Sequence, residues 1–247
     1  MIPATATGQA VGVIMLDTAF PRPAGDLGNP ETFAGRALYE VVPGATAARV
    51  VAGDARDPDL LAGFLAARDR LVARGAAAVT TSCGILAFHQ DALQAGCPVP
   101  VYASALIQMP ALLAAGGRVG VMAMDSRNVT PALLAAVGAP ADTPVVGLED
   151  GTELYPTLRR NRAGDILDLA RAEADVIAAG RALVARAPDL TAIVLECANL
   201  PPYRAALSRA LGLPVHDILT LIAARGGLAI PGTASASVSA SAAPSQP

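Results

Sequence analysis

Residues 78–88 read AVTTSCGILAF, and residues 192–202 read AIVLECANLPP. Each stretch is a short apolar run that leads into a cysteine and then into small residues or prolines. Continuous apolar runs of this kind are typical of strands covered on both faces of a parallel sheet. The chain has only three cysteines, and two of them stand in matching settings 114 positions apart. This spacing indicates an internal repeat.

Two further pairs of segments support the repeat, and they occur in the same order. VGVIMLDT (11–18) returns as VGVMAMDS (119–126), and VPVY (99–102) returns as LPVH (213–216). Three matched pairs in one order make chance a poor explanation. The sequence therefore predicts two related lobes that face each other across a pseudo-twofold axis.

Apolar runs alternate with helical patterns along most of the chain, which predicts an α/β fold. We expect two similar doubly wound parallel-sheet lobes with the active site in the cleft between them. Lobe 1 is expected over residues 1–103, completed by 217–230, and lobe 2 over 104–216. The predicted strands are Val11–Leu16, Ala77–Thr80, Val99–Tyr102, Arg118–Ala123, Pro144–Gly147, Ala192–Leu195 and Pro214–His216.

Helix starts are marked by capping residues. Asp57-Pro58 and Thr130-Pro131 each combine an N-cap residue with a proline at the first helical position. Ser104 is expected to cap a helix that leads to Gly116, and a longer amphipathic helix, carrying Ile166 on or near its apolar face, is expected from about Asp165 to Ala187.

Two segments depart from this alternation. Residues 18–36 are rich in proline and glycine and predict a long ordered loop or a lid, a kind of segment that is often functional. Residues 231–247 are low-complexity Ala/Ser/Pro and predict a disordered tail.

Composition and charge exclude several classes of function. The net charge is −3, with no basic stripe and no aromatic platform, so we expect no nucleic-acid partner. The N-terminus lacks a cationic region, and the most apolar long window is interrupted by polar residues, proline and glycine, so neither a secretory signal nor a membrane span is predicted. A cytoplasmic protein is expected, in which the cysteines are free thiols.

The sequence also predicts neither a metal site nor a cofactor site. The chain has no CxxC and only two histidines, which disfavours a structural zinc site. It has no GxGxxG and no P-loop. Cys97 has no counterpart in the repeat and is expected to pack in the core, and a structural role is favoured for His89.

Cys83 and Cys197 are the candidate catalytic residues. Both follow a strand at its carboxyl end, where parallel α/β sheets bind ligands, and both precede a predicted helix start, with Asn199 as its N-cap. A helix N-terminus favours thiolate over thiol, so lowered thiol pKa values are expected. Inversion of a carbon centre needs a base on one face and an acid on the other, and two facing thiols supply both. Backbone N–H groups would stabilise the developing enolate.

The TSCG around Cys83, the LECAN around Cys197 and the Asp17-Thr18 pair resemble the aspartate/glutamate/hydantoin racemase superfamily, over roughly residues 10–228. The resemblance implies cofactor-independent racemisation or epimerisation of an amino acid or related carboxylate, with Cys83 and Cys197 as paired bases. Its alternatives are a cis–trans isomerase resembling maleate isomerase, in which one cysteine is a nucleophile, and a decarboxylase. A catalytically silent binding protein is the alternative from another class. A homodimer stays open, because dimers are common among relatives.

The resemblance also implies a set of substrate-binding residues. Ser82, Gly84 and the backbone around Asn199 would hold the acid group, and Asp17 and Thr18 would contact the substrate amine or carboxylate. Two further candidates come from the residues themselves: Arg22 for pairing with a substrate carboxylate, and His216 for polarising the substrate or tuning Cys197. Glu196 and Asp217 are interpreted as helix-start or supporting groups.

Overall fold

The computed structural model describes residues 9–52, 57–228 and 230–233. Its strands are β1 (Ala10–Met15), β2 (Ala37–Val41), β3 (Ala76–Thr81), β4 (Val101–Tyr102), β5 (Arg118–Ala123), β6 (Val145–Gly147), β7 (Leu190–Leu195) and β8 (Val215–His216). Its α-helices are α1 (Ala47–Ala52), α2 (Pro58–Ala73), α3 (Gln90–Gln94), α4 (Met109–Ala114), α5 (Pro131–Ala136), α6 (Leu154–Arg160), α7 (Leu169–Arg186), α8 (Arg204–Leu211) and α9 (Ile218–Gly226). Short 3-10 helices are η1 (Pro30–Phe33), η2 (Gly84–His89), η3 (Ala105–Gln108), η4 (Ser126–Asn128) and η5 (Pro201–Tyr203).

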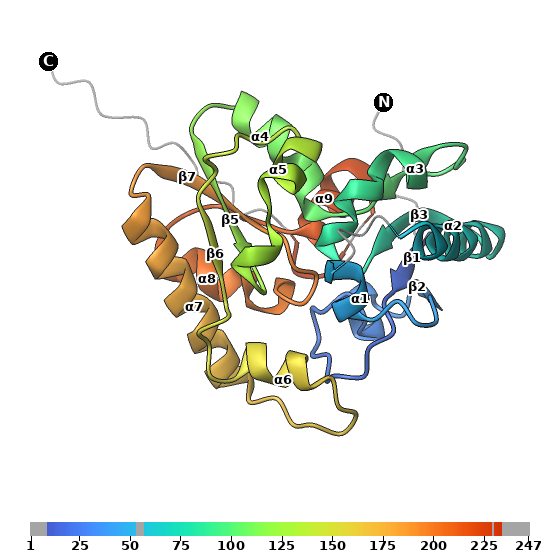
Figure 1. Ribbon diagram of the computed structural model, residues 1–247, viewed down its shortest axis with the longest axis horizontal. Coiled ribbons are helices and arrows are strands. Elements are labelled where there is room, and N and C mark those ends of the chain that lie inside the picture. The colour runs from blue at the N-terminus through green and yellow to red at the C-terminus, as the bar shows by residue number, and fades with distance from the viewer. Residues whose placement is uncertain (1–8, 53–56, 229, 234–247) are drawn as a thin grey trace, which may run out of the picture.

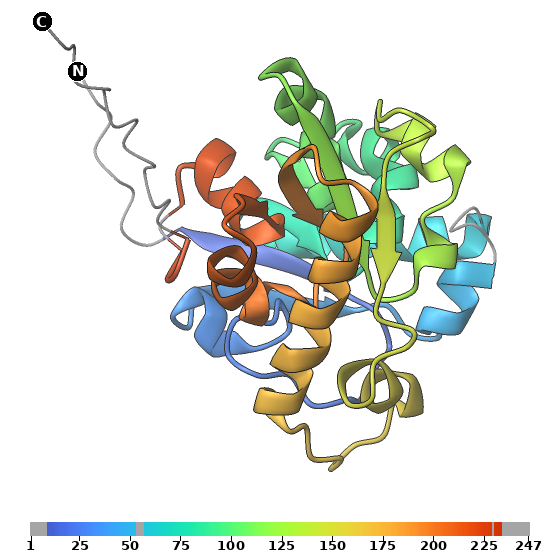
Figure 2. The same ribbon diagram turned by 90° about the vertical axis from the view of Figure 1, so that its left-hand side faces the viewer.

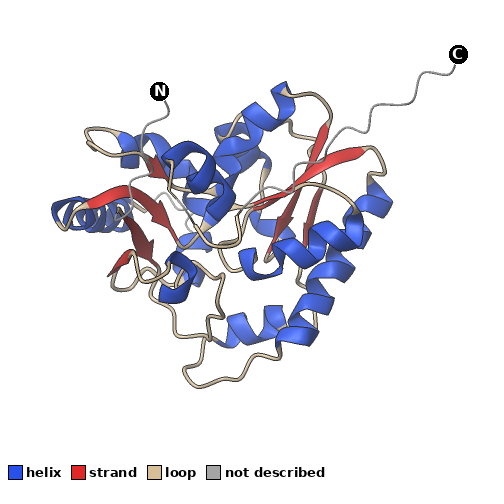
Figure 3. Ribbon diagram, turned by 180° about the vertical axis from the view of Figure 1, so that it is seen from behind, coloured by secondary structure: helices blue, strands red, loops and turns tan. Residues whose placement is uncertain are grey.

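The strands form two four-stranded parallel sheets with the same topology. The first sheet has the order β2-β1-β3-β4 and the second β6-β5-β7-β8. Even the irregularity in register recurs, after Ala10 in the first sheet and after Arg118 in the second. We call each sheet with its helices a lobe. Figure 3 shows the two groups of strands well apart, and Figure 1 shows α2 on the outer side of the first and α7 on the outer side of the second.

The central strands are buried almost throughout, as expected for strands with helices on both faces. Gly12 in β1 and Gly120 in β5 let the outer helix approach closely, since an added Cβ would come to 3.0 Å from side chains of Leu71 and Leu183 respectively. α7 lies in the foreground of Figure 2, along the second sheet. The doubly wound α/β prediction is therefore confirmed.

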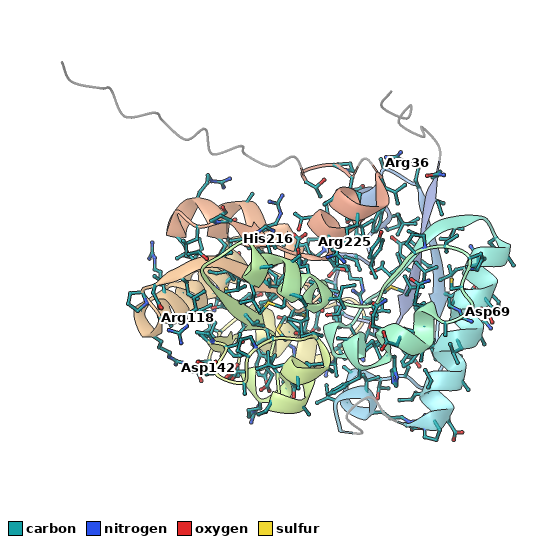
Figure 4. All side chains as sticks on the ribbon, turned by 90° about the horizontal axis from the view of Figure 1, so that it is seen from above. Arg36, Asp69, Arg118, Asp142, His216 and Arg225 are labelled. Atoms are coloured by element: carbon teal, nitrogen blue, oxygen red, sulfur yellow. The ribbon has the colours of Figure 1, made fainter. Side chains whose placement is uncertain are left out.

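One hydrophobic cluster spans both lobes, and a second cluster lies within the second lobe. The larger hydrophobic cluster runs from the first sheet through η2, η3 and α5 to Val121 and Val194 of the second sheet. After β8 the chain returns to the first lobe, where α9 packs beside β4 and η3. In Figure 4 Arg36 and Asp69 mark the side of the first lobe, and Arg118 and Asp142 the side of the second.

Several local predictions need correction. The edge strand β2 was not predicted, because its residues are only half-buried or exposed and lack a continuous apolar pattern. The long helix starts at Leu169, after the N-cap Asp168, so Ile166 precedes it and is exposed instead of packing on its apolar face. The helix after Ser104 begins as a 3-10 turn.

Other local predictions are confirmed or lie outside the described residues. Asp57 and Thr130 cap α2 and α5 as expected. From residue 234 onward, the predicted tail lies outside the described residues. Among the described helices, none combines the length and apolar composition needed to cross a membrane.

Candidate active site

Cys83 and Cys197 occupy equivalent places at the carboxyl ends of β3 and β7. Each lies two positions after its strand and is followed by a short 3-10 helix, η2 or η5. Cys83 packs against the larger core cluster and Cys197 against the second-lobe cluster, and both side chains remain partly accessible. Each lobe therefore contributes one thiol at the strand ends, where α/β proteins bind ligands.

A direct contact joins the two cysteine turns. Gly84 lies so close to Glu196 that a Cβ atom at Gly84 would come within 3.0 Å of both the carbonyl oxygen and the carboxylate of Glu196. Any larger residue would push the turns apart, which explains the glycine after Cys83. The charge of ionised Cys83 also raises the pKa of Cys197. Because Gly84 and Glu196 are the chain neighbours of Cys83 and Cys197, their contact brings the two cysteine turns together across the lobe interface.

Glu196 is a buried carboxyl group in this interface, with 6% of its surface exposed. Burial raises its pKa from 4.5 to about 7. Within the described part of the chain, its carboxylate has no hydrogen-bond or ion-pair partner. Its negative charge raises the pKa of both thiols. The charge of Glu196 therefore disfavours the thiolate form of both cysteines.

Burial, more than the helix termini, sets the acidity of the thiols. It raises the pKa of Cys83 to about 12, and Glu196 adds to the effect, while the backbone N–H groups of Ile85 and Leu86 oppose it. The pKa of Cys197 is also well above its usual value. Burial raises it most, followed by the charges of Glu196, Cys83 and Asp26, while the backbone N–H of Asn199 lowers it. The prediction of lowered thiol pKa values is wrong, because burial of the thiols and the charge of Glu196 outweigh the backbone N–H groups that follow each cysteine.

The loop of residues 18–29 reaches from the first lobe to Cys197. Asp26 is 1% exposed and accepts hydrogen bonds from Arg22 (Nη1 to Oδ1, 2.8 Å), from the Gly28 N–H (2.7 Å) and from Asn199 (Nδ2 to Oδ2, 2.6 Å). Asn199 Oδ1 in turn accepts from Cys197 Sγ at 3.4 Å. A hydrogen-bonded chain therefore connects Arg22 in one lobe to the thiol of the other.

Asn199 is not a helix N-cap, which corrects the prediction. η5 starts two residues later, after Leu200, and no side chain caps it. The buried Asn199 side chain bonds to Cys197 and Asp26 instead. A sequence cannot show this, because the competing partner Asp26 lies 173 positions away.

Most of the other predicted site residues are linked to the cysteine turns. Ser82 Oγ accepts from the Leu16 N–H at 2.9 Å and so joins the ends of β1 and β3. Thr18 Oγ1 accepts from Arg22 Nη2 at 2.7 Å, and the Arg22 guanidinium lies 4.3 Å from the centre of the Phe20 ring. Arg22, Thr18, Gly84 and Asn199 are thus linked to the cysteines directly or through Asp26.

Asp17 and His216 have other surroundings. Asp17 is exposed and accepts from the Gly44 N–H at 3.1 Å. His216 ends β8, and burial together with Arg204 lowers its pKa; it is labelled in Figure 4. Asp217 is the N-cap of α9 in a capping box with Thr220, as its helix-start interpretation predicts.

Sequence reasoning gave too little weight to two buried acids, Glu196 and Asp26. A carboxylate directly after an apolar strand was a usable signal for Glu196, because charged groups are rarely buried without a role. Asp26 carried no such signal, since loop residues are usually exposed. Neither acid belongs to a metal site: among the described residues, no cluster of three or more His, Cys, Asp or Glu side chains could hold an ion.

A cavity of about 450 Å³ lies beside η2 and is lined by Phe88, Gln90, Asp91, Ile107 and Val137 among others. Neither cysteine lines this cavity. The thiols lie instead in the packed interface around Gly84, Glu196 and Asn199. That interface brings two thiols together beside a buried carboxylate, and groups of these types can accept and donate protons.

Known proteins resemble this chain over most of its length. Residues 91–225 match the model of the Asp/Glu/Hydantoin racemase family. "Dimethylsulfoniopropionate lyase 5" of Emiliania huxleyi is 30% identical over 227 residues, which are 86% of this chain and 44% of that protein. "Dimethylsulfoniopropionate lyase" of Durusdinium sp. clade D is 30% identical over 225 residues, 85% of this chain and 71% of that protein. The chain thus spans between about half and three quarters of these relatives.

Solved structures share the fold at lower identity. Allantoin racemase from Pseudomonas fluorescens superposes with a TM-score of 0.54 at 19% identity, covering 89% of this chain and 93% of that one. Unliganded arylmalonate decarboxylase superposes with a TM-score of 0.50 at 19% identity, covering 84% and 86%. At this identity the likeness concerns the fold alone.

Proposed function

The chain belongs to the Asp/Glu/hydantoin racemase family, and we propose that it removes a proton from the carbon beside a substrate carboxylate, with a cysteine as base. The observation that carries this proposal is the contact between Gly84 and Glu196, which joins the turn of Cys83 in one lobe to the turn of Cys197 in the other. A thiolate can take up the proton, and nearby N–H groups can stabilise the enolate that forms. The step calls for no metal or organic cofactor.

The favoured outcome of this step is β-elimination from dimethylsulfoniopropionate, a small carboxylate with a sulfonium group. The cysteine takes the proton from C2, the C2–H electron pair forms the C2–C3 double bond, and the C3–S bond breaks with its electrons on sulfur. Acrylate and dimethyl sulfide are the products, and the thiol then returns its proton to water. The lyase names of relatives that are 30% identical over 85% of the chain support this choice.

Glu196 suits such a substrate. A sulfonium carries positive charge but no N–H, so it needs a carboxylate for its charge and offers no hydrogen bond. Glu196 is a buried carboxylate that forms no hydrogen bond within the described part of the chain. A cation beside it would also offset the charge that raises the pKa of both thiols.

Racemisation or epimerisation of an amino acid or related carboxylate is the second candidate. The presence of a thiol in each lobe favours it, because elimination needs one base whereas inversion needs an acid and a base on opposite faces.

Proton NMR in D₂O separates the two candidates. The reduced protein is incubated with dimethylsulfoniopropionate and, separately, with aspartate, glutamate, a 5-substituted hydantoin, an arylmalonate and maleate. Vinyl signals of acrylate support the lyase, and loss of an α-proton signal without elimination supports the racemase. Cys97→Ala is the matched control and should keep full activity, since Cys97 precedes β4 and Cys83 follows the parallel strand β3, which places them at opposite ends of the sheet. Turnover that persists in the Cys83→Ala/Cys197→Ala double variant would contradict a cysteine base.

A further inference from the structure

The chain of hydrogen bonds from Arg22 to Cys197 has a fixed direction. Asp26 is paired with Arg22 and surrounded by donors, so it accepts at every contact. Asn199 must therefore turn its NH₂ group toward Asp26, which leaves its carbonyl oxygen toward Cys197. A carbonyl oxygen only accepts hydrogen bonds. The sulfur that faces it must carry the hydrogen.

Cys83 has the opposite surroundings. Cys83 is the N-cap residue of η2, at the end of the helix where backbone N–H groups are free, and the N–H groups of Ile85 and Leu86 lower its pKa and so favour a thiolate. Cys197 has one such donor, the Asn199 N–H, together with the side-chain acceptor. The charged groups that act on Cys197 from neighbouring elements are Glu196, Cys83 and Asp26, and all of them disfavour a second negative charge there.

We propose that Asp26 and Asn199 are positioning residues that hold Cys197 as the proton donor and so leave Cys83 as the base. This assignment rests on the proposed proton abstraction. It makes the pair unequal although the fold is duplicated. In elimination, Cys83 takes the C2 proton while the Cys197 thiol donates a hydrogen bond to the developing negative charge.

The assignment predicts different effects of serine at the two positions. A serine hydroxyl still donates a hydrogen bond but is a poor base near neutral pH. Cys197→Ser is therefore expected to keep measurable turnover, whereas Cys83→Ser abolishes it. The reverse order of activities would overturn the assignment.

A second measurement does not depend on turnover. Each cysteine of the full chain is alkylated with iodoacetamide between pH 6 and 10, and its rate is followed by mass spectrometry of the cysteine peptides. In the unmodified protein, Cys83 should react faster than Cys197. Asn199→Ala removes the acceptor that favours the thiol, so alkylation of Cys197 should become about three- to tenfold faster, the size of one lost hydrogen bond. The rate of Cys83 should change little, and Asp26→Asn should act in the same direction.

Asn161→Ala is the matched control. Its side chain accepts from the Ala19 N–H at 2.7 Å and so holds the same loop without touching Asp26 or Cys197. Equal acceleration of Cys197 in Asn161→Ala and Asn199→Ala would mean that loop opening alone is responsible, which would overturn the proposal. An unchanged or slower Cys197 in Asn199→Ala would overturn it as well. If the alkylation pattern holds but no carboxylate of the panel reacts, the positioning role stands and the proposed function fails.

Discussion

At the scale of single residues, Glu196 controls how negative the thiol interface is. It lies against Gly84 and directly precedes Cys197, so its charge acts on both cysteines. Because burial raises its pKa in the folded protein, the folded state binds a proton more tightly than the unfolded state does. The stability that comes from this proton is complete below about pH 4.5 and is lost as the pH rises through about 7.

Glu196→Gln tests this linkage. The unmodified protein should lose on the order of 3 kcal/mol of unfolding free energy between pH 4.5 and 7.5 from this group, since each unit of pKa shift is worth about 1.4 kcal/mol. The variant should lack that part of the pH dependence, as measured by urea unfolding across the range. Glu173→Gln, at an exposed position on α7, is the control and should leave the curve unchanged. Identical curves for all three proteins would contradict the role of Glu196.

The same substitution distinguishes Glu196 from Asn199. Glu196→Gln removes a charge that raises the pKa of both thiols, so iodoacetamide should react faster with Cys83 and with Cys197. Asn199→Ala should accelerate Cys197 alone. A response of only one cysteine to Glu196→Gln would contradict the shared influence.

At the scale of elements, the turn after β3 fits the turn after β7 because residue 84 is a glycine. Gly84→Ala would place a methyl group against the Glu196 carbonyl, where backbone cannot easily move aside. We expect a loss of about 1–3 kcal/mol of unfolding free energy and a marked loss of turnover, because the two thiols separate. Gly226→Ala, where the added Cβ meets Leu228 at an ordinary 3.6 Å, should change stability by less than about 1 kcal/mol. Full activity of Gly84→Ala would show that the contact does not set the thiol geometry.

Many of the helices and strands could be predicted from the sequence. The apolar runs of β1, β3, β5 and β7 and the caps Asp57 and Thr130 are local signals, and local patterns predict them well. β2 could not be predicted, because an edge strand with half-buried residues has no distinct hydrophobic pattern. The raised pKa values of the thiols could not be predicted, because the burial of the cysteines beside Glu196 arises only when the two turns meet.

At the scale of the whole molecule, the loop of residues 18–29 fastens one lobe to the other. Phe20 packs against the core cluster of the second lobe, the Ala19 N–H bonds to Asn161, and Gly25 lies against Pro202. The duplication could be predicted from matched segments such as those around the two cysteines. The crossing of this loop could not, because contacts over 140 or more positions leave no periodic trace.

Phe20→Ala should loosen this attachment. Loss of the ring removes apolar contact with the second lobe and the stacking of Arg22, so Asp26 is less firmly held. Hydrogen exchange measured by mass spectrometry should become faster in residues 18–29 and around Asn199, while α2 keeps its protection. Ile166→Ala, at a residue that is 88% exposed, is the control and should leave the exchange pattern unchanged. Unaltered exchange in Phe20→Ala would mean that polar contacts alone hold the loop.

The arrangement of one thiol in each lobe has a stereochemical consequence. A methylene carbon bound between the lobes turns one of its two enantiotopic hydrogens toward each cysteine. With unequal thiols, one hydrogen is removed and the other is retained. Substrate labelled with deuterium in the R or the S configuration at that carbon should therefore release its label from one isomer and keep it in the other, and only the first should react with a primary isotope effect.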